Sequence, residues 1–253
     1  MFYSVCLPAV FRGIPTAEAV DLAYACGAPS FEIWGWQDQE LDAIAAAQKK
    51  TGLTCTAVCA RSFALTDPSR REEYITGLYS TLEACEKLNC RQIITQVGPD
   101  TGMPREYQHR SIVEGLRACA PILEQRNVTL MIEPLNTAVD HKGYYLTSSR
   151  EALDIVHEAA SPCVKMLFDI YHQQINEGDL ITNLLYCKDE IAHIHVAANP
   201  GRGEPDIDDE INYPAIFKAL SAAGWKGPVG LEYMPKQDAC AGLRRILREM
   251  KLN

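Results

Sequence analysis

Short apolar runs alternate with longer stretches of helical periodicity along the whole chain. The apolar runs have the length of buried strands, and the stretches between them carry apolar residues three or four positions apart. Strands are predicted over residues 2–7, 31–36, 54–60, 91–98, 128–133, 164–169, 191–197 and 229–234. Helices are predicted over residues 16–25, 38–50, 71–88, 111–125, 149–159, 179–187, 213–223 and 238–250.

Eight strand–helix pairs in 253 residues predict an α/β protein with the fold of a (β/α)8 TIM barrel. A doubly wound open sheet is the alternative, but it is expected to carry a glycine-rich turn after its first strand. The chain has neither GxGxxG nor GxxxxGK[ST]. No low-complexity tract or linker divides the sequence, so we expect one catalytic barrel domain over residues 1–253.

The amino-acid composition limits the kinds of partner that this protein is expected to bind. The formal net charge of −9 argues against a nucleic-acid partner, which needs a basic surface, and against an anionic membrane. The ten cysteines show no CxxC spacing and are expected to be reduced core thiols. No export signal or membrane-spanning run is recognised, so we expect a cytoplasmic protein that binds a small molecule.

Four successive predicted strands carry a potential metal ligand at their carboxyl ends. These residues are Glu133, Asp169, His195 and Glu232. Active sites of (β/α)8 barrels lie at this end of the strands. One carboxylate alone is explained equally well by a helix cap or an arginine partner, but four together predict a divalent metal, Mg²⁺ or Mn²⁺, with Co²⁺ also compatible. His193 points to the same side as His195 and is expected one layer deeper, behind the ligand.

The most informative segments are IEPLN, FDIYH, HIHVAANPGRGEP, EINY and GLEYMP. They resemble the hydroxypyruvate isomerase group of the xylose isomerase-like barrels, which also include the ketose 3-epimerases. The similarity runs from FEIWGW to AGLRR and is densest over residues 128–235. It implies that the metal is held by the four strand-end residues and that Glu133 and Glu232 also move protons.

The same resemblance implies that His172 and Arg202 contact the substrate. Arg202 follows the seventh predicted strand in a GRG loop and is suited to bind a carboxylate, with Lys142 as a weaker candidate. Further residues expected near the substrate are Glu32, Trp34 and His141, while Asn136 is expected to hydrogen-bond a ligand from behind. Glu32 has a second interpretation, as the partner of a basic residue inside the barrel mouth.

Some features of the sequence differ from those of the hydroxypyruvate isomerase group. Some hydroxypyruvate isomerases carry glutamine where His195 stands, and histidine is the epimerase residue. The third predicted strand lacks an expected histidine near its end, and the loop with His141 and Lys142 is slightly longer than in the group. Tyr144 to Leu146 are expected to be exposed and to favour a homo-oligomer.

The leading hypothesis is a metal-dependent isomerase that works by enediolate proton transfer, with conversion of hydroxypyruvate to tartronate semialdehyde as the first reaction to test. One alternative is a ketose 3-epimerase or an aldose–ketose isomerase that acts on a neutral sugar. A second is a lyase or decarboxylase that acts on an oxo-sugar acid. A DNA-repair endonuclease barrel is disfavoured by the six histidines and the acidic charge, and a catalytically silent binding barrel also stays open.

Overall fold

Eight parallel strands form a closed barrel in the computed structural model, which describes residues 1–61, 64–206 and 209–252. Each strand pairs with the next, and β8 closes the barrel on β1. The strands are β1 (Phe2–Cys6), β2 (Ser30–Ile33), β3 (Thr54–Cys59), β4 (Gln92–Thr95), β5 (Thr129–Ile132), β6 (Val164–Asp169), β7 (Ile191–Val196) and β8 (Pro228–Leu231). The predicted TIM barrel is therefore confirmed.

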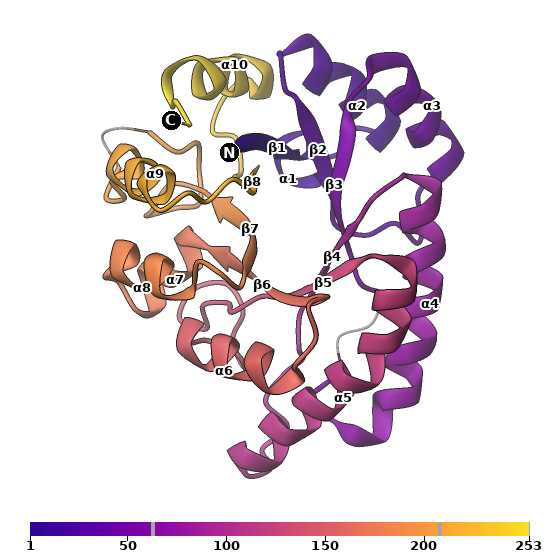
Figure 1. The fold of residues 1–253 in the computed structure, drawn as a ribbon. Coiled ribbons are helices and arrows are strands. Elements are labelled where there is room, and N and C mark those ends of the chain that lie inside the picture. The colour runs from indigo at the N-terminus through magenta and orange to yellow at the C-terminus, as the bar shows by residue number, and fades with distance from the viewer. Residues whose placement is uncertain (62–63, 207–208, 253) are drawn as a thin grey trace.

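Helices surround the barrel on its outer side (Figure 1). They are α1 (Leu7–Val10), α2 (Thr16–Ala25), α3 (Leu41–Thr51), α4 (Arg71–Lys87), α5 (Arg105–Arg126), α6 (Ser149–Ala159), α7 (Ile170–Asn176), α8 (Leu180–Cys187), α9 (Tyr213–Ala222) and α10 (Ala239–Glu249), with a 3₁₀ turn, η1 (Pro68–Arg70). Residues 16–25 and 149–159 were predicted with the observed bounds.

The largest differences from the predicted elements lie at the carboxyl ends of strands and at one helix start. The strand predicted over 91–98 ends at Thr95, and the helix predicted from residue 111 begins at Arg105, after Pro104. The short helices α1 and α7 were not predicted, because each directly continues an apolar strand. The Asp169 side chain caps α7 by accepting a hydrogen bond from the His172 backbone N–H at 3.1 Å.

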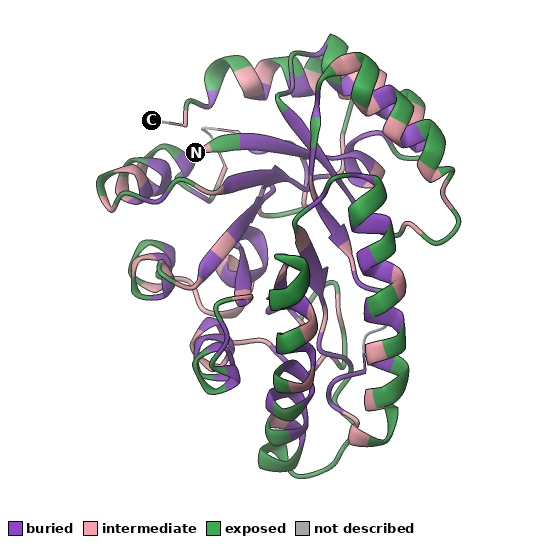
Figure 2. Cartoon of the chain, turned by 45° about the vertical axis from the view of Figure 1, so that its right-hand side comes forward, coloured by how far each residue is buried: buried purple, intermediate pink, exposed green. Residues whose placement is uncertain are grey.

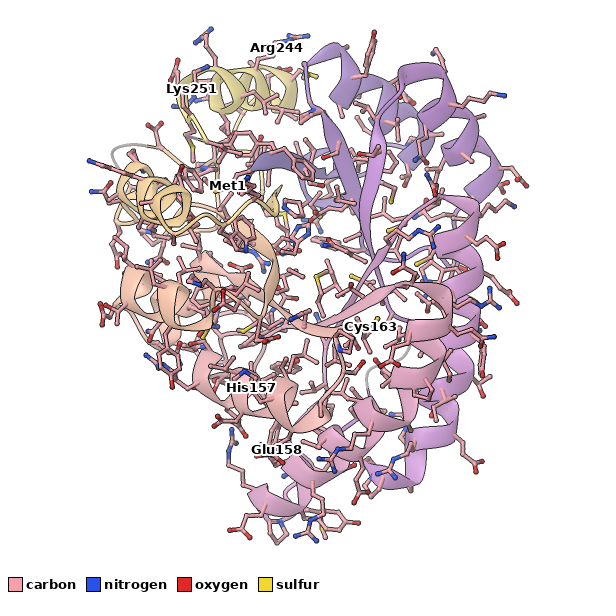
Figure 3. The ribbon with its side chains drawn as sticks, in the orientation of Figure 1. Met1, His157, Glu158, Cys163, Arg244 and Lys251 are labelled. Carbon is pink, nitrogen blue, oxygen red and sulfur yellow. The ribbon has the colours of Figure 1, made fainter. Side chains whose placement is uncertain are left out.

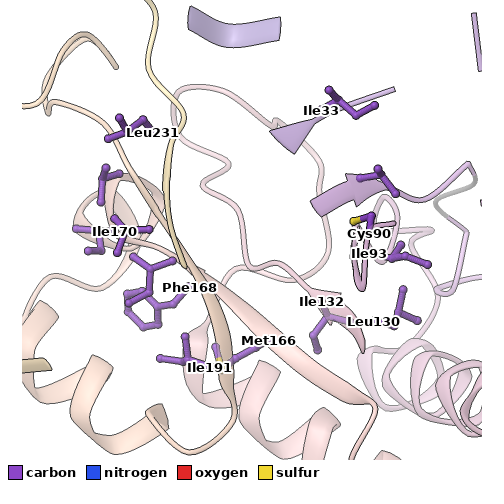
Figure 4. Packing of buried hydrophobic residues seen from close by; sticks show 14 of the residues in the cluster. Ile33, Cys90, Ile93, Leu130, Ile132, Met166, Phe168, Ile170, Ile191 and Leu231 are labelled. Carbon is purple, nitrogen blue, oxygen red and sulfur yellow. The ribbon is translucent and has the colours of Figure 1, made fainter. Parts of the chain in front are cut away.

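Burial follows the two sides of each strand. Figure 2 shows buried strands inside a ring of helices whose outer faces are exposed. Residues such as Leu130, Ile132, Met166 and Phe168 point outward and pack in the layer between strands and helices, part of which Figure 4 shows. This layer forms the main hydrophobic core.

The interior of the barrel has an apolar half and a polar half. Alternate residues of β3 to β6 form a small apolar cluster, made of Ala57, Ile94, Met131 and Leu167. The inward residues of β1, β2, β7 and β8 include the polar or glycine residues Ser4, Glu32, His193, His195 and Gly230. Strand alternation explains this division, because the apolar neighbours of these polar residues face the helices.

The barrel closes where the two ends of the chain meet. Figure 3 shows Arg244 at the junction of α10 and α2, where its guanidinium donates to the Ala25 carbonyl at 3.4 Å. All ten cysteines are free, as expected. Among the described residues, no helix combines the length and the apolar character needed to cross a membrane.

Candidate metal centre and active site

Three carboxylates converge at the carboxyl-terminal mouth of the barrel. Glu133 directly follows β5, Asp169 ends β6 and Glu232 directly follows β8. These three side chains and His172 place one potential ligand atom each within 4.8 Å of one another, and all four residues are buried. The structure therefore brings together the three carboxylates that the strand ends predicted.

The His195 imidazole approaches the same carboxylates from β7. Its Nδ1 lies 3.5 Å from Glu133 Oε1, 3.5 Å from Glu232 Oε2 and 4.0 Å from Asp169 Oδ2. Burial disfavours a charged imidazole, but the surrounding carboxylates of Glu32, Glu232 and Glu133 raise the pKa of His195 well above its usual value. His195 thus faces all three carboxylates through one ring nitrogen.

Glu32 lies behind the histidines rather than in the cavity. Its Oε1 is 2.7 Å from His195 Nε2, and its Oε2 is 2.9 Å from His193 Nε2. Although burial opposes ionisation, the two imidazoles lower the pKa of Glu32 to about 2. The second interpretation of Glu32, as the partner of a basic residue, fits this geometry. On the far side, His193 Nδ1 contacts Gln92 Oε1 at 3.1 Å.

Gly230 of β8 makes room for this buried group. It pairs in register with His195, and a Cβ atom at this position would lie 2.5 Å from His195 Cδ2, 2.8 Å from His193 Nε2 and 2.9 Å from Glu32 Oε1. Any larger residue would displace the two imidazoles. A glycine is therefore required here by close approach rather than by backbone conformation.

Both carboxylate oxygens of Glu232 are engaged. Oε1 accepts a hydrogen bond from the Trp34 indole N–H at 2.7 Å, and Oε2 pairs with Arg202 Nη2. Burial opposes ionisation of Glu232, but His195 and Arg202 hold its pKa well below its usual range. Glu232 is thus ionised and fixed in orientation. Trp34, expected as a wall of the pocket, lines the cavity and also supplies this donor.

A tight loop after β7 aims Arg202 at the carboxylates. Arg202 has a left-handed backbone with φ of 52°, which is uncommon for a residue other than glycine. Its N–H donates to the Ala198 carbonyl at 2.9 Å, and its carbonyl accepts from the Met234 N–H at 2.8 Å. The side chain also lies over the Tyr171 ring, with its guanidinium carbon 5.3 Å from the ring centroid. The backbone bonds hold this strained residue in place.

Glu133 differs from Glu232 in having an unengaged oxygen. Its Oε1 is buried and has no hydrogen-bond partner among the described residues. Its backbone carbonyl accepts from the Tyr144 hydroxyl at 3.0 Å, and that hydroxyl accepts from the Val97 N–H at 2.8 Å.

The expectation that Tyr144 to Leu146 are exposed was wrong. Tyr145 and Leu146 are buried in the core, with exposed fractions of 2% and 0%. The Tyr144 hydroxyl is enclosed, because it bridges the segments that follow β4 and β5. The loop therefore packs inward, and its apolar residues give no support to self-association.

His172 belongs to a hydrogen-bonded chain at the rim. Its Nδ1 lies 2.7 Å from Asn136 Nδ2, which also lies 2.7 Å from Asp140 Oδ2, and Asp140 accepts from the Tyr171 hydroxyl at 2.9 Å. The other nitrogen, Nε2, is 3.6 Å from Asp169 Oδ2 and has no hydrogen-bond partner among the described residues. Burial lowers the pKa of His172 to about 4. The predicted supporting residue Asn136 thus acts on His172, whereas Asp140 and Tyr171 were missed because only the folded loop brings them there.

A cavity of about 380 Å³ opens above the carboxylates. Among the residues expected to contact the substrate, His172, Arg202, Trp34 and His141 line it, and the His141 ring lies edge-on to His172 with centroids 5.2 Å apart. Lys142 is exposed and does not line this cavity. The cavity wall formed by β3 and β4 contributes Arg61 and Gln96, which no pattern in the sequence indicated.

The family described as xylose isomerase-like TIM barrel matches residues 20–250. The chain belongs to this family. This assignment agrees with the closed barrel and with the strand-end position of the carboxylates.

Two curated relatives are isomerases. Hydroxypyruvate isomerase of Escherichia coli (strain K12) is 36% identical over 178 residues, which cover 70% of this chain and 68% of that protein. The 2-oxo-tetronate isomerase of Cupriavidus necator is 38% identical over 131 residues, which cover 52% and 50% of the two chains. The resemblance to the hydroxypyruvate isomerase group and the prediction of an isomerase are confirmed.

Several solved structures match nearly the whole chain, and one of them is more than 25% identical to it. It is described as an AP endonuclease of family 2 from Brucella melitensis, with a TM-score of 0.93 and 28% identity, over 99% of this chain and 100% of that one. This likeness supports the barrel fold along its full length.

Proposed function

We propose that this xylose isomerase-like barrel is a divalent-metal-dependent isomerase of small hydroxy-2-oxo acids, with interconversion of hydroxypyruvate and tartronate semialdehyde as its first candidate reaction. The observation that carries the proposal is the convergence of Glu133, Asp169 and Glu232 on His195 Nδ1 beside the cavity. The curated relatives support the choice of a hydroxy-oxo acid.

The residues fit a metal ion. Glu133 Oε1 and His195 Nδ1 are buried without hydrogen-bond partners among the described residues and lie 3.5 Å apart. Unpartnered buried polar atoms are costly, and a shared cation would satisfy both. We assign Glu133, Asp169, His195 and Glu232 as the ligands, a mainly oxygen set that suits Mn²⁺ or Mg²⁺. Such an ion would polarise the substrate carbonyl and stabilise the negative charge of an enediolate.

The proton chemistry is assigned chiefly to Glu133. In hydroxypyruvate, a carboxylate removes one proton from C3, and the same carboxyl group returns it to C2, while the hydroxyl proton is transferred from O3 to O2, so that the isomerisation is balanced. With Oε1 of Glu133 assigned to the metal ion, its Oε2, which has no hydrogen-bond partner among the described residues, is left for the proton, whereas Trp34 and Arg202 contact both oxygens of Glu232. The sequence expectation that the two glutamates share proton transfer thus becomes an unequal division, with Glu133 as the proton carrier.

Other residues hold the carboxylates and histidines of the site in their charge states and orientations. Arg202 keeps Glu232 ionised, and His172, neutral because of its lowered pKa, directs Nε2 toward the carboxylates. Asn136 and Asp140 hold the His172 ring in this orientation. Glu32 and His193 support His195 from inside the barrel.

The alternatives use the same chemistry in part. A 3-epimerase or aldose–ketose isomerase would act on a neutral sugar, and a lyase would expel a group from the enediolate instead of reprotonating it.

The solved structure described as an endonuclease raises the DNA-repair hypothesis again. The net charge of −9 does not favour a DNA substrate.

The test is a metal-dependent conversion assay. Protein treated with a chelator and dialysed is assayed by NMR with hydroxypyruvate, with 2-oxo-tetronate and with a neutral ketose, before and after addition of Mg²⁺. We expect an isomerised product from an oxo acid only after the metal is restored, and no product with Asp169→Asn. The proposal fails if the metal-loaded enzyme converts none of the oxo acids, or if chelation leaves the rate unchanged.

A further inference from the structure

The wall of the cavity that faces away from the arginine-bound Glu232 carries two hydrogen-bond donors. Arg61 lies two residues after the end of β3, and Gln96 directly follows β4. Both line the same cavity as Glu133 and His195, together with the apolar side chains of Ala60 and Ile94. β3 and β4 are neighbouring strands, so these donors stand on one side of the cavity mouth.

Neither side chain is engaged elsewhere in the described part of the chain. Arg61 is exposed. Among the described residues it makes a hydrogen bond through its backbone, where its N–H donates to Thr81 Oγ1 at 3.2 Å. For Gln96, the recorded contact is likewise through the backbone, where its carbonyl accepts from the Thr95 hydroxyl at 3.3 Å. Both side chains are therefore available to a ligand.

Arg202, the residue expected to bind a substrate carboxylate, is in a different position. Its Nη2 pairs with Glu232 Oε2 and lies 4.0 Å from Asp169 Oδ2. Its charge is used to balance the carboxylates of the site. With a divalent ion also present, the three carboxylates are about neutralised, so the extra positive charge of Arg61 is what suits the cavity to an anion.

We propose that Arg61 and Gln96 bind the carboxylate of the substrate, while its hydroxyl and carbonyl carbons face Glu133. This inference rests on the proposed function and deepens it, because it assigns the site to acids rather than to neutral sugars. A guanidinium and a carboxamide together donate to both oxygens of a carboxylate, and the apolar side chains of Ala60 and Ile94 line the cavity beside them.

The first experiment measures the steady-state kinetics of Arg61→Gln, which removes the charge and leaves a shorter, neutral hydrogen-bond donor. We expect kcat/KM for hydroxypyruvate to fall about 10- to 100-fold, mainly through a higher KM, as for loss of a charge-assisted hydrogen bond. Arg110→Gln is the matched control, since Arg110 is exposed on α5 away from this cavity. A fall of less than about twofold for Arg61→Gln, equal to that of the control, would overturn the assignment.

A second experiment needs no turnover. Binding of glycerate and of glycerol to the Mg²⁺-loaded protein is followed by NMR titration, since the two differ in the carboxylate. We expect wild type to prefer glycerate by about tenfold or more, and Arg61→Gln to lose this preference. Equal binding of both probes by wild type, or an unchanged preference in Arg61→Gln, contradicts the inference. If the wild-type enzyme is active but binds glycerate and glycerol equally, this inference fails and the proposed function stands. If the wild-type enzyme is inactive but prefers glycerate, the proposed function fails and this inference stands.

Discussion

Glu32 Oε1 lies 2.7 Å from Nε2 of His195, so the opposite ring nitrogen of this histidine faces the carboxylate cluster. A carboxylate behind a ligating histidine sets its tautomer and ring orientation. Glu32, on the inward-facing side of β2, thus orients His195 of β7 across the barrel interior, although the two strands are not neighbours.

Glu32→Gln is expected to weaken metal binding. The carboxamide keeps the shape of the side chain but removes the negative charge and leaves one acceptor oxygen for the two imidazoles of His193 and His195, which now each face a carboxylate oxygen. We expect the affinity for Mn²⁺, measured by isothermal titration calorimetry, to fall about 10- to 100-fold. Glu18→Gln, on the exposed face of α2, is the matched control. An affinity equal to that of the control would show that Glu32 plays no part in positioning the ligand.

Gly230→Ala is expected to disturb the same buried group by crowding. The new methyl group would approach His195, His193 and Glu32 within 2.9 Å, and none of these enclosed side chains has room to move away. Over-packing of this kind typically costs about 1–3 kcal/mol of the free energy of unfolding. Thermal unfolding and Mn²⁺ titration should both show a loss.

The control for this change is Gly242→Ala on α10. There the added methyl group meets the flexible Glu204 side chain at 3.0 Å, outside the barrel interior. We expect this variant to retain its metal affinity. A Gly230→Ala protein with wild-type unfolding and wild-type metal binding would refute the requirement for close approach.

Tyr144→Phe tests the support of Glu133. The lost hydroxyl leaves the Val97 N–H and the Glu133 carbonyl without their shared partner. We expect a loss of about 1–3 kcal/mol in the free energy of unfolding, measured with urea, together with a lower kcat. Tyr79→Phe, which alters an exposed ring on α4, should change neither quantity. If both variants behave alike, the Tyr144 bridge is dispensable.

The stability of the metal-free protein should depend on pH through His172. Its pKa is lowered from 6.5 to about 4 in the folded state, so the unfolded chain binds more protons between these values. The unfolding free energy should therefore fall as pH falls from about 6.5 to 4, by up to about 1.4 kcal/mol for each pH unit. His172→Gln should lose this part of the slope. Parallel curves for the two proteins would contradict a buried neutral His172.

Much of the fold was accessible from sequence because strand and helix signals alternated in a regular order. The strand-end positions of Glu133, Asp169, His195 and Glu232 followed from this order, since parallel strands of a barrel end at one face. The exact ends of strands were less accessible, because the apolar pattern continued past Thr95 and Ile33 into the loops.

Contacts between loops could not be predicted from local patterns. Tyr144 to Leu146 resemble an exposed apolar loop, but the folded segment buries Tyr145 and Leu146 and leaves Tyr144 partly buried. Arg61 gave no signal in the sequence, because its proposed role depends on a cavity that residues of or directly after β3, β4, β5 and β7 line together. The engagement of Glu232 by Trp34 likewise joins residues far apart in the chain.

The central claim is that Glu133 moves a substrate proton at a metal site, and deuterium exchange tests it most directly. Hydroxypyruvate is incubated in D₂O with Mg²⁺-loaded enzyme, and the loss of the C3 proton signal is followed by NMR for wild type and Glu133→Gln. We predict enzyme-dependent exchange or isomerisation with wild type, and a loss of at least about 100-fold with Glu133→Gln. Undiminished exchange in Glu133→Gln that binds the metal normally would contradict the account.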